Sequence, residues 1–335
     1  MIILIKVHVP IKAKEYDILI KKGILSDINQ YIDTSRQIVI ISDDNIPKKY
    51  INILLSKLDN PLSLFIPEGE QSKSMEMASI LINQLLENKI TRSATIIALG
   101  GGVVGDLVGF VSSIYLRGVD YIQIPTTLLS QIDSSVGGKV GVNTKTMKNA
   151  IGAFKQPKLV LIDPDTLSTL DQRQISSGIS EMIKYALIAS KPLFKELEEN
   201  NILDNIEHYI ATCVSIKKDL VVQDEYDYGL RQLLNYGHTI GHAIEQYSNY
   251  ELLHGEAIAI GMVQMAKQKA FYQDLVTVLH KYNLPTQYEY DKETIFQLIQ
   301  TDKKASNQRL NIILVDEVGK GYIKPINISD IKERI

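Results

Sequence analysis

Three of the six histidines in this chain of 335 residues lie in one short segment, and their spacing favours metal binding. His238 and His242 stand four residues apart on a predicted helix, so their side chains share one face, as in a chelating pair. The residue after His238 is threonine, where zinc proteases with the H-E-x-x-H motif carry their catalytic glutamate, which disfavours a metalloprotease. The third ligand could be His254 or a carboxylate such as Glu181. Two histidines and a carboxylate with one open position are typical of catalytic zinc, and histidines packed in a helical core are the alternative.

A glycine-rich turn stands where a phosphate could bind. Residues 100–106 read Gly-Gly-Gly-Val-Val-Gly-Asp between a predicted strand and a predicted helix, so backbone N–H groups can face a phosphate. Gly100, Gly102 and Gly105 match the G-x-G-x-x-G pattern of dinucleotide-binding proteins, and Asp120 lies near the spacing of the ribose-binding carboxylate. At least two predicted strands precede the turn, which does not fit the usual register of that pattern. Tight packing of strand against helix is the alternative.

Two further sets of residues offer groups that bind anions. The stretch 126–154 is rich in glycine and polar residues, and we expect residues 125–143 to form a ligand-binding loop that contributes little core, with a merely solvated loop as the alternative. Its Lys139, Lys148 and Asn149 are donors suited to phosphate or carboxylate oxygens. The histidines are flanked by Lys217, Arg231, Asn235, Lys303 and Lys304. This second set predicts a pocket for a substrate with more than one negative group, whereas a solvated surface is the alternative for each lysine.

Composition excludes several classes of protein. The chain has 36 basic and 39 acidic residues, a net charge of −3, which argues against nucleic acid or an anionic membrane as partner. Cys213 is the only cysteine, so no intramolecular disulfide can form, and a reducing cytoplasmic setting is expected. The apolar N-terminus reaches lysine after five residues, too short for a signal peptide or a membrane span.

The elements that must position these groups follow two different patterns. Short apolar runs alternate with helical patterns such as 74–86, which predicts parallel βαβ units. The predicted strands cover 37–42, 62–66, 94–99, 121–125 and 159–163. The predicted helices of the second half cover 175–189, 193–199, 202–222, 229–247, 254–272 and 292–301, followed by a small hairpin over 312–315 and 321–324. We therefore expect a Rossmann-like α/β domain with a parallel sheet over 1–163, a mostly α-helical metal-binding domain over 164–335, and ligands in a cleft between them.

Six motifs, taken in order, resemble the 3-dehydroquinate synthase family of sugar-phosphate cyclases. They cover residues 100–106, 133–139, 148–154, 181–185, 229–242 and 254–256. The resemblance runs from about Asp43 to Lys304, and the ordered set is far more specific than any one motif. It implies a homodimeric enzyme that binds NAD and one divalent metal, zinc or cobalt. It also implies conversion of 3-deoxy-D-arabino-heptulosonate 7-phosphate to 3-dehydroquinate and phosphate in the shikimate pathway, towards chorismate and the aromatic amino acids.

The resemblance also implies roles for individual residues. It makes Glu181, His238 and His254 the metal ligands and leaves His242 for the substrate. It assigns NAD binding to Asp43, Glu68, Gly69, Glu70, Gln71, Ser72, Lys73, Gly101, Gly102, Val103, Val104, Gly105, Asp106, Thr126, Thr127, Lys139, Lys148, Thr166, Leu167, Ser168 and Thr169. It assigns substrate binding and catalysis to Lys139, Asn149, Lys184, Lys217, Arg231, Asn235, His242, Lys303 and Lys304, with Asp133 ordering the pocket and Arg117 reaching across a dimer interface.

The implied reaction begins with oxidation of a hydroxyl by NAD, continues with loss of phosphate and return of the hydride, and ends with ring opening and aldol closure. Three features depart from the family pattern: Asp227 in place of glutamate, Val140 in place of threonine, and the loop 144–147. Three alternatives stay open: a metal-dependent polyol dehydrogenase that releases NADH, a cyclase for another sugar phosphate, and a regulatory protein without turnover.

Overall fold

The computed structural model describes residues 3–12, 14–144, 147–302 and 309–335, and the side chain of residue 302 is not described. Its contacts divide the chain into two compact units, residues 1–170 and 171–335. The first unit therefore includes the short helix η5 (Pro164–Thr169), which the sequence analysis assigned to the second domain. Among the described residues, no helix has both the length and the apolarity of a membrane-spanning segment.

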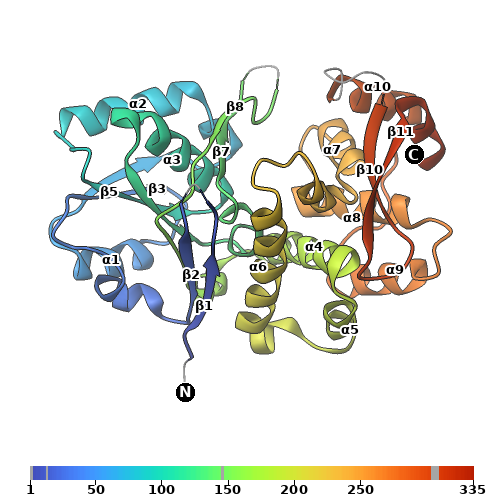
Figure 1. The fold of residues 1–335 in the computed structure, drawn as a ribbon, viewed down its shortest axis with the longest axis horizontal. Coiled ribbons are helices and arrows are strands. Elements are labelled where there is room, and N and C mark those ends of the chain that lie inside the picture. Colours follow the sequence, from blue (N-terminus) through green and yellow to red (C-terminus); the bar gives the residue numbers. More distant parts are fainter. Residues whose placement is uncertain (1–2, 13, 145–146, 303–308) are drawn as a thin grey trace. The chain divides into compact units, whose positions relative to one another are not determined.

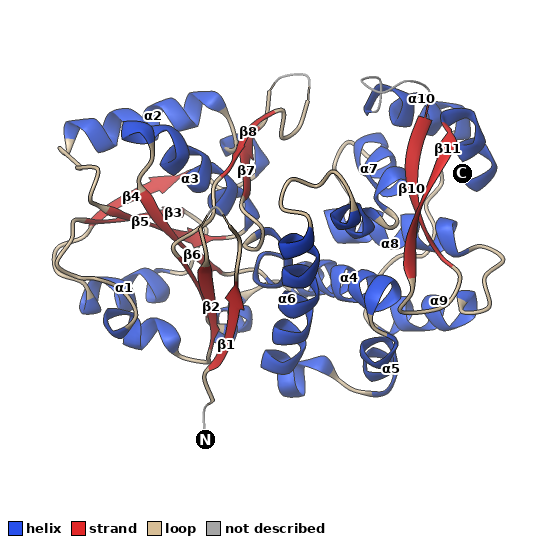
Figure 2. Ribbon diagram, viewed as in Figure 1, coloured by secondary structure: helices blue, strands red, loops and turns tan. Residues whose placement is uncertain are grey.

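The first unit is built on one sheet, in which the described residues form seven strands (Figures 1 and 2). Their spatial order is β1 (Ile5–Val9), β2 (Tyr16–Ile20), β9 (Leu159–Ile162), β6 (Asp120–Pro125), β5 (Thr95–Gly100), β3 (Ile38–Asp43) and β4 (Leu62–Ile66). Only β1 pairs antiparallel, with β2, and the remaining pairs of this sheet are parallel. The parallel α/β fold predicted from the sequence is confirmed.

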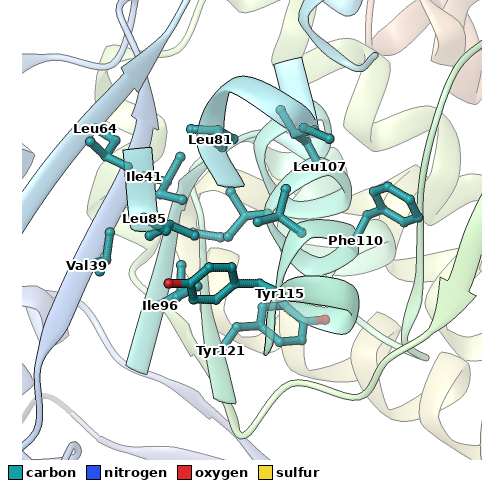
Figure 3. Packing of buried hydrophobic residues seen from close by; sticks show 14 of the residues in the cluster. Val39, Ile41, Leu64, Leu81, Leu85, Ile96, Leu107, Phe110, Tyr115 and Tyr121 are labelled. Atoms are coloured by element: carbon teal, nitrogen blue, oxygen red, sulfur yellow. The ribbon is translucent and has the colours of Figure 1, made fainter. Parts of the chain in front are cut away.

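Helices cover both faces of this sheet, which explains the unbroken apolar runs in the sequence. Strand β3 alternates between the faces: Val39 and Ile41 pack into one core, and Ile38 and Ile40 pack into the other. The first core lies under α2 (Met75–Glu87) and α3 (Gly102–Ile114) and is drawn in Figure 3. The second lies under η1 (Ile24–Gln30) and α1 (Lys48–Lys57), two elements that the sequence pattern did not predict.

The strand order places the glycine turn at a natural ligand site. From β3 the chain moves outwards to β4, returns to the other side of β3 as β5, and continues to β6 and β9. This is the 2-1-3-4-5 order of doubly wound folds, in which ligands bind beyond the carboxyl ends of the first and third strands. The turn follows β5, the third strand of that series. The glycine turn comes after at least two strands, which does not fit the usual G-x-G-x-x-G pattern but does fit this strand order.

The stretch 126–154 is not the core-free loop that the sequence led us to expect. It contains a short π-helical turn, η4 (Ser130–Ser134), and a hairpin of β7 (Lys139–Val142) and β8 (Ile151–Phe154). Val140 and Val142 belong to the first hydrophobic core. The expectation was wrong because Gly141 and Gly152 face each other across the hairpin and allow its strands to approach, and such glycines suggest a loop in the sequence.

The second unit is mostly helical, as predicted. Its helices are α4 (Gln172–Ala189), α5 (Lys191–Glu199), α6 (Ile206–Gln223), α7 (His238–Tyr247), α8 (His254–Ala266), α9 (Tyr272–Lys281) and α10 (Lys292–Asp302), and its hairpin is β10 (Arg309–Val315) with β11 (Gly321–Asn327). One predicted helix is interrupted and another ends early. The helix expected over 229–247 is split into η7 (Leu230–Asn235) and α7, because Gly237 has a φ of 79°. The helix expected over 254–272 stops at Ala266, because Gln268 has a φ of 68°.

Candidate functional site

Three helices of the second unit bring the expected metal ligands together. Glu181 lies in the middle of α4, His238 is the first residue of α7, and His254 is the first residue of α8. The Nε2 atoms of both histidines lie 3.7 Å from Glu181 Oε1. The ring of His242, one turn further along α7, is centred 5.1 Å from that of His238 and 5.6 Å from that of His254.

Glycines allow the backbones of these helices to touch. A Cβ atom on Gly255 would lie 2.0 Å from the carbonyl oxygen of Ser177 in α4, and the Gly255 N–H donates to Ser177 Oγ at 3.0 Å. A Cβ atom on Gly261 of α8 would lie 2.1 Å from the carbonyl oxygen of Gly237, just before α7. Gly255 therefore lets α8 approach α4 beside His254, and Gly261 lets α8 approach the start of α7 beside His238.

The hydrogen bonds of the two imidazoles leave the same nitrogen of each ring directed at Glu181. His238 Nδ1 donates to the Tyr236 carbonyl oxygen at 3.1 Å, because a carbonyl can only accept. His254 Nδ1 lies 3.2 Å from Glu245 Oε2 and donates to that carboxylate. Nε2 is then the nitrogen available for a metal in both rings, the arrangement usual for histidine ligands.

Glu181 itself fits a metal ligand. Its side chain is fully buried, and its Oε2 accepts from Lys184 Nζ. Within the described residues its Oε1 has no hydrogen-bond partner, which is costly for a buried carboxylate. Ligand atoms that share a tetrahedral zinc ion lie about 3.3–3.6 Å apart, so distances of 3.7 Å to two imidazole nitrogens need almost no adjustment. The donor set therefore fits a divalent cation.

Electrostatics distinguish the two histidines. Burial lowers the pKa of His238 well below its usual value, and the charges of Lys184 and His242 lower it further, so this ring is neutral. Burial acts in the same direction on His254, but the carboxylates of Glu181 and Glu245 outweigh it and raise the pKa of His254 to about 9. A metal at His254 Nε2 must therefore displace a proton.

A second ligand set shares two of these residues. One nitrogen each of His238, His242 and His254 lie within 4.8 Å of one another, so the three histidines could also hold a metal. His242 is exposed, whereas Glu181 is fully buried and lies closer to the other two rings. We therefore favour Glu181 as the third ligand, which leaves His242 as the exposed imidazole beside the site.

Cations also gather in this unit. Lys184, Lys217 and Arg231 are all buried, at 1%, 6% and 2% exposure. Arg231 donates to the carbonyl oxygen of Glu225 at 2.6 Å, and Asn235 is exposed at the end of η7. Lys184 and Arg231 also have partners within the chain, and lysine and arginine side chains are donors that can bind the oxygens of an anionic ligand. Lys303 and Lys304, predicted for the same role, lie outside the described residues.

In the first unit, the predicted NAD residues meet at the carboxyl edge of the sheet. They occupy the ends of β3, β4, β5, β6 and β9: Asp43, Glu68 to Lys73, Gly101 to Asp106, Thr126 with Thr127, and Thr166 to Thr169. Burial raises the pKa of Asp43, and backbone N–H groups oppose this shift. Tyr50 joins η5 to α1 through its hydroxyl, 3.0 Å from Thr169 Oγ1.

This edge also fits a dinucleotide. Gly101 precedes α3, and within the described residues no side chain caps the N-terminus of that helix. Thr126 is buried, and its Oγ1 has no hydrogen-bond partner among the described residues. Gly105 is needed for packing, because a Cβ atom there would lie 3.0 Å from Gln123 of β6. The turn therefore combines phosphate-binding geometry with the tight packing that the sequence left as an alternative.

Lys73 connects this edge to the segment after β7. It is buried, and its Nζ lies 2.5 Å from Asp106 Oδ2 and 2.5 Å from Asn149 Oδ1. Asn143 adds three contacts: its N–H donates to the Lys73 carbonyl at 2.8 Å, its Nδ2 to Glu70 at 2.8 Å, and its Oδ1 accepts from the Asn149 N–H at 2.9 Å. Hydrogen bonds thus join the Glu70–Lys73 segment to Asn143 and Asn149.

Asp120 does not have the role that the spacing suggested. It begins β6, whereas the glycine turn follows the end of the parallel strand β5, so the two lie at opposite edges of the sheet. Its carboxylate pairs with Lys14 at 2.7 Å and Arg36 at 3.4 Å. A ribose-binding role for Asp120 was wrong, because residue spacing does not show at which end of the next strand a carboxylate lies.

The other predicted site residues of the first unit lie on turns and strand ends. Lys139 is exposed at the start of β7, Asp133 is half-buried in η4, and Lys148 and Asn149 are exposed after β7. Arg117 is exposed beyond the far end of α3, about 20 Å along the helix axis from the glycine turn at 1.5 Å per residue. It cannot reach the glycine turn of its own unit.

Sequence reasoning missed several residues that support the site. Glu245 lies 3.2 Å from His254 Nδ1, and Arg173 pairs with Glu256 at 2.6 Å in the first turn of α8. Asn143 joins the two segments of the first unit. The position of Glu245 one turn after His242 was the available signal, but a glutamate near a helix end usually faces solvent.

Comparisons with known proteins agree on one family. Models described as 3-dehydroquinate synthase N-terminal and C-terminal match residues 63–177 and 178–305. A 3-dehydroquinate synthase of Enterococcus faecalis is 40% identical to the chain, covering 98% of this chain and 97% of that protein. One of Clostridium botulinum is 41% identical, with coverages of 97% and 99%.

Solved structures share the fold. A 2-deoxy-scyllo-inosose synthase complexed with carbaglucose-6-phosphate, NAD+ and Co2+ aligns with a TM-score of 0.88 at 26% identity, covering 98% of both chains. A 2-epi-5-epi-valiolone synthase from Streptomyces hygroscopicus with NAD+ and Zn2+ bound aligns with a TM-score of 0.86 at 25% identity, covering 97% of this chain and 96% of that one. An iron-containing alcohol dehydrogenase aligns with a TM-score of 0.64 at 12% identity over 95% of this chain and 96% of that one, which shows the fold alone.

Proposed function

The chain belongs to the 3-dehydroquinate synthase family, and on that premise we propose how its residues divide the work of the reaction. It is an enzyme with 3-dehydroquinate synthase activity in the shikimate pathway. The family's substrate, 3-deoxy-D-arabino-heptulosonate 7-phosphate, carries a phosphate and a carboxylate. The proposal concerns the residues that hold this substrate, the metal and NAD.

Glu181, His238 and His254 hold the divalent metal. The observation that carries this assignment is the buried Glu181 Oε1, without a hydrogen-bond partner among the described residues and 3.7 Å from two imidazole Nε2 atoms. Zinc and cobalt are the expected metals, since related cyclases have been crystallised with Zn2+ or Co2+. A bound divalent cation polarises a sugar oxygen, and NAD takes up and returns a hydride.

Residues of the second unit grip the anionic substrate. Lys184, Lys217 and Arg231 are buried cations, and Arg231 offers the planar fork that suits a carboxylate or phosphate. Asn235 and His242 are exposed and add hydrogen-bonding groups, with His242 beside the metal ligands. Holding both anionic ends of the substrate brings its reacting carbons together for ring closure. Lys303 and Lys304 stay predictions for the same task.

Residues of the first unit bind NAD and complete the anion grip. The carboxyl edge of the sheet holds the cofactor through residues 68–73, the glycine turn, Thr126 and Thr127, and η5. Lys139, Lys148 and Asn149 provide donors for leaving phosphate, and Asp133 orders the turn before Lys139. Because no net redox change occurs, these residues must retain the reduced cofactor until the hydride returns.

The enzyme acts as a homodimer in the cytoplasm. The resemblance places Arg117 across a dimer interface, and its separation of about 20 Å along α3 from the glycine turn of its own unit supports that assignment. Its backbone is fixed in a tight turn, with φ of 46° at Leu116 and 62° at Arg117. A single cysteine is consistent with a reducing compartment.

Phosphate release from the heptulosonate phosphate tests the proposal. With NAD and zinc, the protein should release one phosphate per 3-dehydroquinate formed, with no accumulation of NADH. Glu181→Gln should lose bound metal and turnover together, because an amide is a weak zinc ligand. Stoichiometric NADH with simple polyols would instead identify a dehydrogenase. Full metal content and full activity in Glu181→Gln would refute the ligand assignment.

A further inference from the structure

His254, the first residue of α8, lies against two other helices, α4 and α7. Its backbone begins α8, where the Gly255 N–H donates to Ser177 Oγ of α4 at 3.0 Å. Arg173 of α4 donates to both carboxylate oxygens of Glu256, through Nε at 2.6 Å and Nη2 at 2.7 Å, and Glu256 accepts the Leu253 N–H at 2.8 Å. These contacts fix where the backbone of α8 starts. They do not fix the rotation of the His254 ring.

The ring is oriented by α7. Glu245 Oε2 lies 3.2 Å from His254 Nδ1, on the side of the ring opposite to Nε2 and Glu181. The Glu245 side chain is only 13% exposed, so this charged acceptor acts where solvent competes little. His238 differs, because its Nδ1 donates to the neutral Tyr236 carbonyl at 3.1 Å. The two histidines therefore have acceptors of different charge.

We propose that Glu245 is a positioning residue that orients His254 and makes it the stronger imidazole ligand of the metal. The inference rests on the ligand set proposed above and adds a residue to which no role had been assigned. A carboxylate behind an imidazole fixes the ring tautomer, so Nε2 carries the lone pair, and it raises the basicity of that nitrogen. Loss of such a carboxylate typically weakens metal binding 10–100-fold.

Metal affinity and cobalt spectra test this role without relying on activity. Zinc affinity is measured by chelator competition on the full-length protein, and the visible spectrum of the Co2+-loaded protein reports the geometry of the ligands. Glu245→Ala should weaken zinc binding about 10–100-fold and shift the Co2+ bands. Glu245→Gln keeps an acceptor for Nδ1 without its charge, so the loss should be smaller, about 3–10-fold. Gln246→Ala, on the neighbouring exposed residue of α7, should match the parent.

The outcomes separate this role from a purely structural one. Parental zinc affinity and an unchanged Co2+ spectrum in Glu245→Ala would overturn the proposal, even if the melting temperature fell. If Glu245→Ala does not fold, Glu245→Gln decides the question in the same way. Glu181→Gln, measured in parallel, tests the ligand set: parental affinity in that variant would refute the proposed metal site itself.

Discussion

Replacing Gly255 with alanine should separate α8 from α4 and weaken the metal site. The new Cβ atom would lie 2.0 Å from the Ser177 carbonyl oxygen, whereas ordinary contacts of this kind lie at about 3.5 Å, so the backbones must move apart by about 1.5 Å. The Glu181–His254 distance of 3.7 Å would then approach about 5 Å. Two ligands at about 2.1 Å from one zinc ion cannot be more than about 4.2 Å apart, so His254 would be lost as a ligand.

The expected result is a loss of zinc affinity of at least ~100-fold, measured by chelator competition. Overpacking should also destabilise the protein by ~1–3 kcal/mol, partly offset by the better helix propensity of alanine. Gly321→Ala is the matched control: its Cβ atom would meet Ile188 Cβ at 3.1 Å, near the other end of α4. It should lower stability slightly and leave zinc affinity unchanged. Parental zinc affinity in Gly255→Ala would refute the reasoning.

Two further predictions concern the first unit. Lys73→Met removes a buried cation that contacts Asp106 and Asn149, so the Kd for NAD measured by calorimetry should rise at least ~10-fold and the free energy of unfolding should fall by ~1–3 kcal/mol. Lys57→Met, at an exposed position of α1, should leave both quantities unchanged. Unaltered NAD binding in Lys73→Met would exclude Lys73 from the cofactor site. Val140→Thr restores the residue common in the family but places a hydroxyl in the core against Gly109. The free energy of unfolding, measured by heat or urea, should therefore fall by ~1–3 kcal/mol. Equal or greater stability would contradict this and show that the hydroxyl finds a hydrogen-bond partner.

The sequence predicted best the strands that are buried on both faces. Strands β3 and β5, predicted over 37–42 and 94–99, lie within one residue of those bounds, because these central strands are covered on both faces and appear as short apolar runs. Strand β1 was missed because its exposure alternates along an edge, and β7 and β8 were missed because glycines stand inside them. These strands are stabilised by pairing with a neighbouring strand and do not form an unbroken apolar run of their own, so the apolar pattern did not reveal them.

In the candidate site, too, local sequence patterns revealed some residues, whereas others depend on contacts between different helices. The spacing of His238 and His242 identified a metal-binding face, but spacing alone could not choose the third ligand, since that residue comes from another helix. The residues left Glu181 and His254 as candidates, and the resemblance to the family made both of them ligands; the role of Glu181 stays a prediction that its position beside two imidazoles supports. Glu245 was not predicted because its function depends on a ring nine positions further along the chain.

The contacts made by Lys73 have a consequence for how the affinities of the two ligands depend on each other. One ammonium group restrains both Asp106, on the cofactor side, and Asn149, which is proposed to contact substrate. A ligand that immobilises either residue lowers the entropic cost of immobilising the other, so occupancy at one favours occupancy at the other. Thermodynamic linkage makes this effect equal in both directions: whatever factor NAD contributes to substrate affinity, substrate must contribute to NAD affinity. A cofactor held more tightly while the sugar is present would be retained through the oxidised and reduced stages of a single turnover.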